Sequence, residues 1–410
     1  MKRIVIVGGG AAGMAAAIAA AEQAPRAEIR VLERLTAPGK KLLATGNGRC
    51  NLTNLRASPA QYQTSSPEAL AQILAGTTPE DVLAFFRALG LWCAEEDEGR
   101  VYPRSRQAAS VLAVLQLTME RRGVLVECGK AAAGLSREGK GFSLRCTDGS
   151  EYRADAVVLT SGGKAAGKLG SDGSGYRLAK AMGHHWAPLY PALTPLKCDM
   201  SRCGSLKGIR AEGSVALQAN GVLLGRETGE VQFTEYGLSG IPVMQLSGLL
   251  GRVPPGQKLL AEVDLFPELP EAALLRELQE RKRRLTGESC RTLLLGLLHD
   301  RLAAAALRCV DTREETPIRA LPAEKTEALS RLLKGWPFPV LGPLGYDSAQ
   351  VSGGGVLLEE IWPETMESRL QPSLYFAGEL LDAAGGCGGF NLHWAWCTGI
   401  RAGNSAALEK

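Results

Sequence analysis

The chain's length, composition and charge are those of an ordinary globular protein. It has 410 residues, 45% hydrophobic and 22% charged, which is enough for two or three domains with large buried cores. The formal net charge of +4 fits an anionic cofactor as easily as a nucleic acid, and no dense basic tract with interleaved aromatic residues is present. No apolar run is long enough to span a bilayer, and the ten cysteines include no C-x-x-C pair, so we expect a cytoplasmic protein with reduced thiols and no metal site.

Residues 1–33 have the pattern of one βαβ unit. The fully apolar run 4–7 predicts a parallel strand that is buried on both faces. An alanine-rich helix is expected over 14–23 and a second strand over 28–32. Strand, glycine-rich turn, helix and strand within this length are typical of a Rossmann-type βαβ unit.

Three glycines between the first strand and the helix, Gly8, Gly10 and Gly13, have the spacing of a dinucleotide-binding turn. Such glycines allow a tight turn, a close approach of the backbone to a pyrophosphate and close packing of helix on strand. The helix N-terminus offers N–H groups to the phosphates, and Glu33 follows the second strand, where a carboxylate binds ribose hydroxyls. The fingerprint predicts a dinucleotide cofactor but does not separate FAD from NAD.

Helices and strands continue to alternate up to residue 182. We expect helices over 67–90, 110–122 and 176–182, strands over 124–128 and 155–160, and a hairpin of 142–146 and 151–153 around the turn Asp148-Gly149.

The pattern changes near Trp186, where several prolines mark a crossing between domains. Short alternating runs over 190–267 predict antiparallel β structure, and 269–333 has the periodicity of helices. The basic run 281–284 falls in a predicted helix, so we interpret it as a solvated helical face. A closing helix is expected over 393–408.

A late strand over 374–376 is followed by Ala377-Gly378-Glu379 and then by Asp382. In FAD proteins an element of this form returns the chain to the isoalloxazine and ribityl region, and a domain that binds NAD alone does not need it. Together with the position of the glycine turn and the lack of a second such turn in the sequence, it favours FAD.

Several longer motifs resemble those of one family. They are the run GKKLLATGNGRCNLTN at 39–54, QVSGGGV at 350–356, TMES at 365–368, YFAGE at 375–379 and GGFNLHWA at 388–395. On these residues the chain resembles the YhiN/BaiN-like flavoprotein family, also labelled aminoacetone-oxidase-like, nearly from end to end.

The resemblance implies an α/β fold with a Rossmann-type, three-layer FAD-binding domain of the glutathione-reductase kind. It also implies a β-rich middle domain with a helical insert, the same division that the residue patterns predict. The expected boundaries are 1–188 with 353–410 for the FAD domain, 189–268 with 335–352 for the middle domain and 269–334 for the insert.

The resemblance also extends the set of expected FAD contacts beyond the glycine turn and Glu33. The full expected set is Gly8, Gly10, Ala11, Ala12, Gly13, Glu33, Arg34, Lys40, Lys41, Gly46, Asn47, Gly48, Arg49, Cys50, Asn51, Ala132, Thr160, Ser161, Gly162, Gly378, Glu379, Asp382, Gly389, Phe390 and Asn391.

The chain departs from the family pattern where substrate is expected to lie. Glu235 stands where the family often has a histidine, Pro242 lies one place late, and His393 replaces the usual glutamine before Trp394. His393 is a candidate proton donor and Tyr236 could hydrogen-bond a substrate carbonyl, with a structural role as the alternative for each.

As a function, the resemblance implies an FAD-dependent oxidoreductase. We expect NADH or NADPH to drive reduction of an activated C=C bond in a small organic substrate, and relatives suggest a 3-oxo steroid or bile-acid intermediate. One alternative is a flavin oxidase of a small amine such as aminoacetone that uses O₂. Another is an RNA-associated flavoprotein in tRNA modification, although we expect neither a membrane nor a nucleic acid as partner. The oligomeric state stays open.

Overall fold

The computed structural model describes residues 1–201, 203 and 206–408. The chain forms two compact units, one of Met1–Pro191 with Ala349–Lys410 and the other of Ala192–Ser348. The first unit therefore takes its residues from both sides of the second along the chain. None of the helices that the structure describes combines the length and the apolarity needed to cross a membrane.

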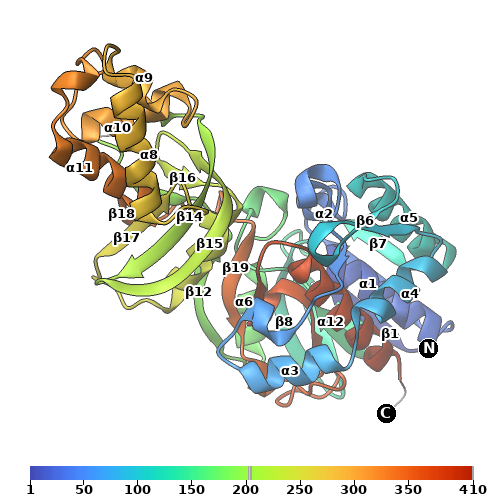
Figure 1. The fold of residues 1–410 in the computed structure, drawn as a ribbon. Coiled ribbons are helices and arrows are strands. Elements are labelled where there is room, and N and C mark those ends of the chain that lie inside the picture. Colours follow the sequence, from blue (N-terminus) through green and yellow to red (C-terminus); the bar gives the residue numbers. More distant parts are fainter. Residues whose placement is uncertain (202, 204–205, 409–410) are drawn as a thin grey trace. The chain divides into compact units, whose positions relative to one another are not determined.

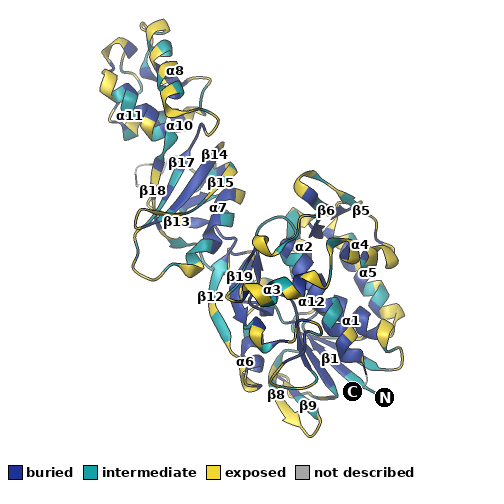
Figure 2. Cartoon of the chain, turned by 60° about the horizontal axis from the view of Figure 1, so that its bottom comes forward, coloured by how far each residue is buried: buried dark blue, intermediate teal, exposed yellow. Residues whose placement is uncertain are grey.

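A five-stranded parallel sheet forms the centre of the first unit, in the order β20-β11-β1-β2-β7. Figure 1 labels β1 and β7 of this sheet. Its strands are β1 (Arg3–Val7), β2 (Glu28–Glu33), β7 (Leu125–Cys128), β11 (Ala156–Leu159) and β20 (Leu374–Phe376). Val7 lies in register with Leu32 and with Leu159, so the carboxyl ends of these strands meet at one edge. Because β1 lies in the middle of the sheet, residues 4–7 are all buried, as their apolar run predicts (Figure 2).

Two helices from distant parts of the chain, α1 (Ala11–Gln23) and α12 (Phe390–Ala407), pack directly on each other. A Cβ atom added at Gly399 would lie 2.5 Å from the carbonyl oxygen of Ala12, and one at Gly403 would lie 2.2 Å from that of Ala16. The backbones approach this closely only because glycines face alanines along the contact.

Five further helices belong to the first unit: α2 (Lys40–Ala44), α3 (Pro67–Ala75), α4 (Pro79–Ala88), α5 (Ala108–Arg121) and α6 (Ser174–Ala181). The helix expected over 67–90 is wrong as one element, because it is two helices. Thr78 caps the second helix with a reciprocal bond to Asp81, and Pro79 occupies its first position.

Smaller sheets complete the first unit. They are β8 (Ala132–Glu138), β9 (Gly141–Cys146) and β10 (Glu151–Ala154); β3 (Thr53–Asn54), β6 (Arg100–Pro103) and β5 (Cys93–Glu95); β4 (Tyr62–Gln63) with β21 (Ala384–Gly385); and β12 (Trp186–Ala192) with β19 (Val351–Val356). The β8–β10 sheet packs on β1 and β11 as a third layer, and β9 and β10 form the hairpin that the sequence predicts. The expected Rossmann-type fold is confirmed.

The second unit is a closed six-stranded barrel with a group of helices. The barrel order is β13 (Leu196–Cys198), β16 (Gly237–Ser239), β15 (Val222–Phe233), β14 (Arg210–Ala219), β17 (Leu259–Asp264) and β18 (Trp336–Pro343). The helices are α7 (Ile241–Ser247), α8 (Glu271–Arg284), α9 (Cys290–Leu294), α10 (Asp300–Cys309) and α11 (Ala323–Lys334). One continuous hydrophobic core runs through the barrel and the helices that follow β17.

Candidate functional site

The turn after β1 requires glycine at two positions, because a side chain there would clash with backbone atoms. Gly8 has a φ of 108°, and a Cβ atom there would lie 2.6 Å from the carbonyl oxygen of Thr160. At Gly13 a Cβ atom would lie 1.9 Å from the oxygen of Gly8. At Gly10 the direction of a Cβ atom is open, with no atom within 4 Å. Gly8 and Gly13 are thus glycines for the fold, and Gly10 keeps space open at the start of α1.

The N-terminus of α1 presents backbone donors to this space. Gly10 is the N-cap residue and supplies no side-chain cap, and the first helical bond runs from the Met14 N–H to the Gly10 oxygen. The N–H groups of Ala11, Ala12 and Gly13 therefore have no acceptor within the helix. Such donors, at the positive end of the helix dipole, fit the pyrophosphate of a dinucleotide.

Glu33 lies at the end of β2 beside the same turn. Its buried carboxylate accepts hydrogen bonds from the N–H of Gly9 and the N–H of Leu35, each 2.8 Å long. These bonds fix the orientation of the carboxylate where a ribose is expected. The neighbouring Arg34 forms an ion pair with Asp172.

The segment 45–51 is a loop with unusual backbone geometry. Gly46, Asn47, Gly48 and Cys50 all have positive φ, between 55° and 83°. Asn47 and Cys50 carry side chains in this conformation, which costs on the order of 1–3 kcal/mol each. The Arg49 guanidinium lies 4.5 Å from the centre of the Tyr102 ring. Burial raises the pKa of the Cys50 thiol to about 12, which disfavours its thiolate form.

Asn51 joins this loop to the N-terminus of α12. Its Oδ1 atom is buried without a hydrogen-bond partner, and a Cβ atom at Gly389 would lie 2.7 Å from it. Gly389 is the N-cap of α12, has a φ of 98° and provides no side-chain cap. A buried acceptor without a donor beside a helix N-terminus is what a bound, hydrogen-bonding cofactor would satisfy. The residues present therefore fit FAD.

An ion pair connects the α2 segment to the turn after β20. The Lys41 ammonium lies 2.6 Å from Glu379 Oε2 and donates to the Ala165 oxygen at 3.2 Å. Glu379 Oε1 accepts the N–H of Ser352 at 2.9 Å. The Ser352 hydroxyl in turn accepts the N–H groups of residues 164 and 165. The structure thus brings Lys41 and Glu379 together, and a contact of either residue with FAD stays a prediction.

Asp382 and Asn391 hold neighbouring loops in place. Asp382 Oδ2 accepts from the N–H and the hydroxyl of Ser65, at 2.7 and 2.5 Å. Asn391 exchanges hydrogen bonds with the backbone of Gly385, at 2.9 and 2.7 Å. Both side chains therefore shape the wall of the site, and direct contact with a cofactor stays a prediction for each.

The remaining expected contacts lie around the same edge of the sheet. Thr160 donates to the oxygens of Val7 or Gly8, both 2.9 Å away. Ser161 Oγ is buried without a hydrogen-bond partner, and Gly162 has a φ of 74°. Ala132 begins β8, Lys40 begins α2 and Phe390 begins α12. We call the whole set of expected contacts the cofactor cradle.

His393 lies inside the first unit, on α12. Its Nδ1 is 2.9 Å from Thr53 Oγ1 and its Nε2 is 3.3 Å from Cys397 Sγ. Burial lowers its pKa to about 4, which leaves a neutral imidazole between two side chains. These surroundings favour the structural alternative, and the catalytic role stays a prediction.

Tyr236 lies in the second unit, between β15 and β16. It is half-buried, and its carbonyl oxygen accepts the N–H of Cys198. Its role toward a substrate also stays a prediction.

The sequence did not single out Tyr190, Gln63 or Ser352, which the structure places beside the cradle. Ser352 lies within the 350–356 motif, which could have revealed it. Tyr190 and Gln63 carry no local signal, because their contacts join distant parts of the chain.

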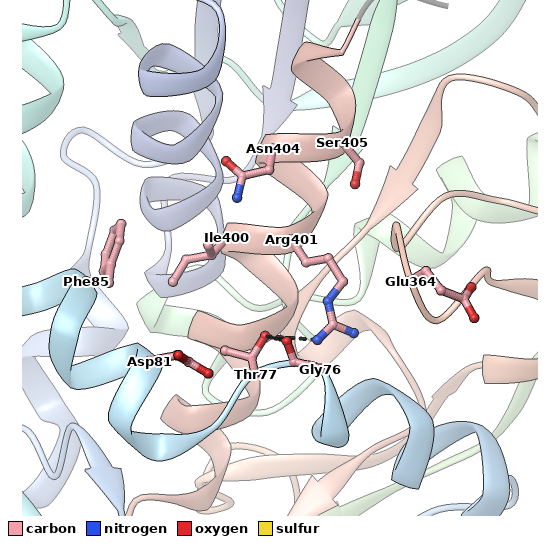
Figure 3. Close-up of a pocket in the computed structure, with 9 residues that line it drawn as sticks. All are labelled: Gly76, Thr77, Asp81, Phe85, Glu364, Ile400, Arg401, Asn404 and Ser405. Carbon is pink, nitrogen blue, oxygen red and sulfur yellow. Dashed lines mark hydrogen bonds between the residues drawn. The ribbon is translucent and has the colours of Figure 1, made fainter.

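A separate pocket of about 380 Å³ lies beside the C-terminal half of α12 (Figure 3). Its lining residues are Gly76, Thr77, Asp81, Phe85, Glu364, Ile400, Arg401, Asn404 and Ser405. Arg401 crosses it and donates to the Thr77 hydroxyl and the Pro363 oxygen. None of the expected cofactor contacts lines this pocket.

The chain is similar to known proteins over nearly its whole length. The family model described as HI0933-like protein Rossmann domain matches residues 2–405. A 3-dehydro-bile acid delta(4,6)-reductase of Clostridium scindens is 40% identical over 408 residues, which cover 99% of each chain. A ribosomal RNA dihydrouridine synthase of Escherichia coli is 29% identical over 395 residues, 96% of this chain and 94% of that protein.

Solved structures show the same fold at low identity. A 3-ketosteroid delta1-dehydrogenase from Sterolibacterium denitrificans superposes with a TM-score of 0.50 at 15% identity, covering 99% of this chain and 100% of that one. At this identity the likeness concerns the fold alone.

Proposed function

Because the chain belongs to the HI0933-like family of FAD-dependent oxidoreductases, we propose that it reduces a carbon–carbon double bond conjugated to a ketone in a steroid of the bile-acid type, with NADH or NADPH as electron donor. The observation that carries the proposal is the 40% identity to a 3-dehydro-bile acid delta(4,6)-reductase across 99% of both chains. We also place the protein in the cytoplasm. In support, none of the ten cysteines, all of which lie in the described residues, forms a disulfide.

The cradle gives each part of FAD a place in this proposal. The N–H groups at the start of α1 hold the pyrophosphate, and the fixed carboxylate of Glu33 accepts a ribose hydroxyl. Asn51 Oδ1 and the N-terminus of α12 would bind further polar groups of FAD. When bound, FAD supplies the hydride chemistry that links the nicotinamide to the substrate.

An RNA substrate is the second candidate, since two relatives at 29% and 26% identity are named ribosomal RNA dihydrouridine synthases. The reactions named for these relatives both reduce a carbon–carbon double bond, so the chemistry of the cradle serves either. The basic run of α8 gives no support to RNA binding. Arg281 donates to the oxygens of Leu293 and Leu295, and the next lysine donates to Leu321. The last two arginines of the run pair with Glu280. We therefore prefer the small molecule.

The test is an anaerobic, two-stage experiment on the purified holoprotein. NADH or NADPH is first added, and bleaching of the flavin absorbance is followed. A 3-oxo-4,6-diene bile acid is then added, and return of the absorbance together with a product that has gained hydrogen is expected.

Three other results would contradict the proposal. No bleaching by either nucleotide would remove the nicotinamide as donor. Reoxidation by O₂ but not by the steroid, with bleaching by aminoacetone, would indicate the amine oxidase. Reoxidation only by ribosomal RNA, with formation of dihydrouridine, would indicate the RNA enzyme.

A further inference from the structure

Reduction of a double bond beside a ketone requires a proton as well as a hydride, and several candidate acids in and beside the cradle already make contacts within the protein. Both nitrogens of His393 contact buried side chains. Glu379 pairs with Lys41, and Asp382 holds Ser65. These groups are held by contacts within the first unit, and a group outside this set is a further candidate for the proton donor.

Tyr190 differs from these groups in its position. It lies on β12, which pairs with β19, and its side chain is half-buried. A Cβ atom at Gly353 of β19 would lie 2.0 Å from Cζ and 2.5 Å from the hydroxyl oxygen of Tyr190. The φ of Gly353 is outside the left-handed region, so glycine is required there for space. The absence of a side chain at Gly353 therefore leaves space on β19 for the Tyr190 ring.

Two short paths connect the Tyr190 hydroxyl to the cradle. On one side it donates to Gln63 Oε1 at 3.1 Å, and Gln63 pairs with Ala384 of β21. The next residue of β21, Gly385, is held by Asn391. On the other side, Ser352 precedes Gly353 and donates its N–H to Glu379.

We propose that Tyr190 is the catalytic acid of the reaction and that Gln63 is its positioning residue; this inference rests on the proposed function. The hydride that originates from the nicotinamide adds to the carbon β to the ketone. The π bond breaks, and its electron pair forms the enolate. The Tyr190 O–H bond then breaks, and its proton forms the new C–H bond at the α carbon. Solvent returns a proton to the tyrosinate, which its half-buried position permits.

The Gln63 amide can serve both states of the phenol. The oxygen and nitrogen of an amide exchange places by a flip of the side chain. In one orientation the amide oxygen accepts a hydrogen bond from the phenol hydroxyl, as in the 3.1 Å contact. In the other the amide nitrogen donates to the phenol oxygen, which frees the proton for the substrate and stabilises the tyrosinate.

The first test compares Tyr190→Phe with Tyr152→Phe, which removes a hydroxyl on β10 that donates to Glu127 of β7. Both holoproteins should retain flavin and be reduced by nicotinamide as fast as the wild type. Reoxidation by the enone should slow roughly 100- to 10,000-fold in Tyr190→Phe alone. Equal reoxidation rates in the two variants would overturn the inference while the proposed function stands.

A second measurement separates the two proposals when the wild type does not reduce the enone. That result would reject the proposed function. Tyrosine next to an isoalloxazine quenches its fluorescence by electron transfer, and phenylalanine does not. A longer flavin fluorescence lifetime in Tyr190→Phe, but not in Tyr152→Phe, would support a place for Tyr190 at the reaction centre. Unchanged lifetimes in both would overturn it.

Gln63→Leu tests the positioning role. The pH profile of kcat/KM should keep a basic limb, because Tyr190 is present, but the limb should move to higher pH without the amide donor. In Tyr190→Phe the limb should be absent. A profile of Gln63→Leu identical to that of the wild type would contradict the role of Gln63.

Discussion

At the scale of single residues, burial decides the chemistry of His393. Its neutral ring is favoured in the folded protein, where the pKa is lowered from 6.5 to about 4. Between these values the unfolded chain binds the proton and the folded chain does not. The free energy of unfolding is therefore largest above pH 6.5 and falls as the pH falls toward 4.

Replacing His393 by the family's glutamine should remove this dependence. On going from about pH 7 to about pH 5, we expect the free energy of unfolding of the wild type to fall by about 2 kcal/mol more than that of His393→Gln. Urea unfolding of both proteins at the two pH values measures it, and the second buried histidine, His184, cancels because both proteins contain it. Parallel losses of stability in the two proteins would show that His393 is protonated in the fold.

Glu33 should control the affinity for FAD. In Glu33→Gln an amide NH₂ replaces one of the oxygens that accept the Gly9 and Leu35 N–H groups, so a donor would face a donor. We expect roughly a 10- to 100-fold loss of FAD affinity, measured by titrating apoprotein and following flavin fluorescence. The control is Glu28→Gln at the other end of β2, where the half-buried carboxylate pairs with Arg30. Equal affinities in the two variants would contradict the assignment.

The sequence predicts the role of a residue when its contacts lie close to it along the chain, and not when they join distant segments. The roles of Gly8 and Gly13 follow from their spacing, and Glu33 from its distance along the chain, and the structure places all three at one turn. The meeting of Asn51 with Gly389, and of Tyr190 with Gly353, depends on pairing of segments far apart in sequence. The spacing of residues along the chain does not predict such contacts. The family motifs contain Asn51 and Gly389 and indicated a place for both near the cofactor, but no motif contains Tyr190.

At the scale of elements, the contact of α1 with α12 depends on glycine. We expect Gly403→Ala to lower the stability of the first unit by about 1–3 kcal/mol, because the new methyl group would meet the Ala16 carbonyl in a closely packed seam. FAD affinity should fall as well, since the N-terminus of α12 carries Gly389 and Asn391.

The control for this variant is Gly134→Ala on β8, where the nearest atom to an added Cβ would be 3.8 Å away. Thermal unfolding of both holoproteins gives the comparison. A melting temperature of Gly403→Ala equal to that of Gly134→Ala would show that α1 and α12 can move apart to accommodate the methyl group without a loss of stability.

Strongly periodic elements were predictable, and breaks within them were not. The strand 374–376 agrees with β20 residue for residue, and the closing helix differs from α12 mainly at its start. The 67–90 region has apolar spacing on both sides of Gly76, so periodicity alone did not reveal the break. The signal was Thr78-Pro79, an N-cap followed by a proline at the first helical position.

At the scale of the whole molecule, each unit has its own hydrophobic core. We therefore expect two calorimetric unfolding transitions, of which only one rises in temperature when FAD is added, because the cradle belongs to Met1–Pro191 with Ala349–Lys410. Scans of apoprotein with and without FAD test this. A single transition that moves as a whole would mean that the units unfold together.

The sequence predicts domain boundaries at 188/189 and 352/353, and the structure divides the chain into two units at 191/192 and 348/349. The β-rich part and the helical insert were expected as separate parts. In the structure the barrel and the helices after β17 share one core, because the leucine-rich faces of those helices need the barrel's residues to complete their burial.

The order of segments along the chain has a consequence for synthesis. The β20 strand and the α12 helix complete the first unit but leave the ribosome after all of residues 192–348. The barrel unit can therefore close while the central parallel sheet still lacks its edge strand and α1 still lacks its partner helix. Capture of FAD becomes the last event of maturation, and a nascent chain arrested before α12 should be folded in its middle and colourless.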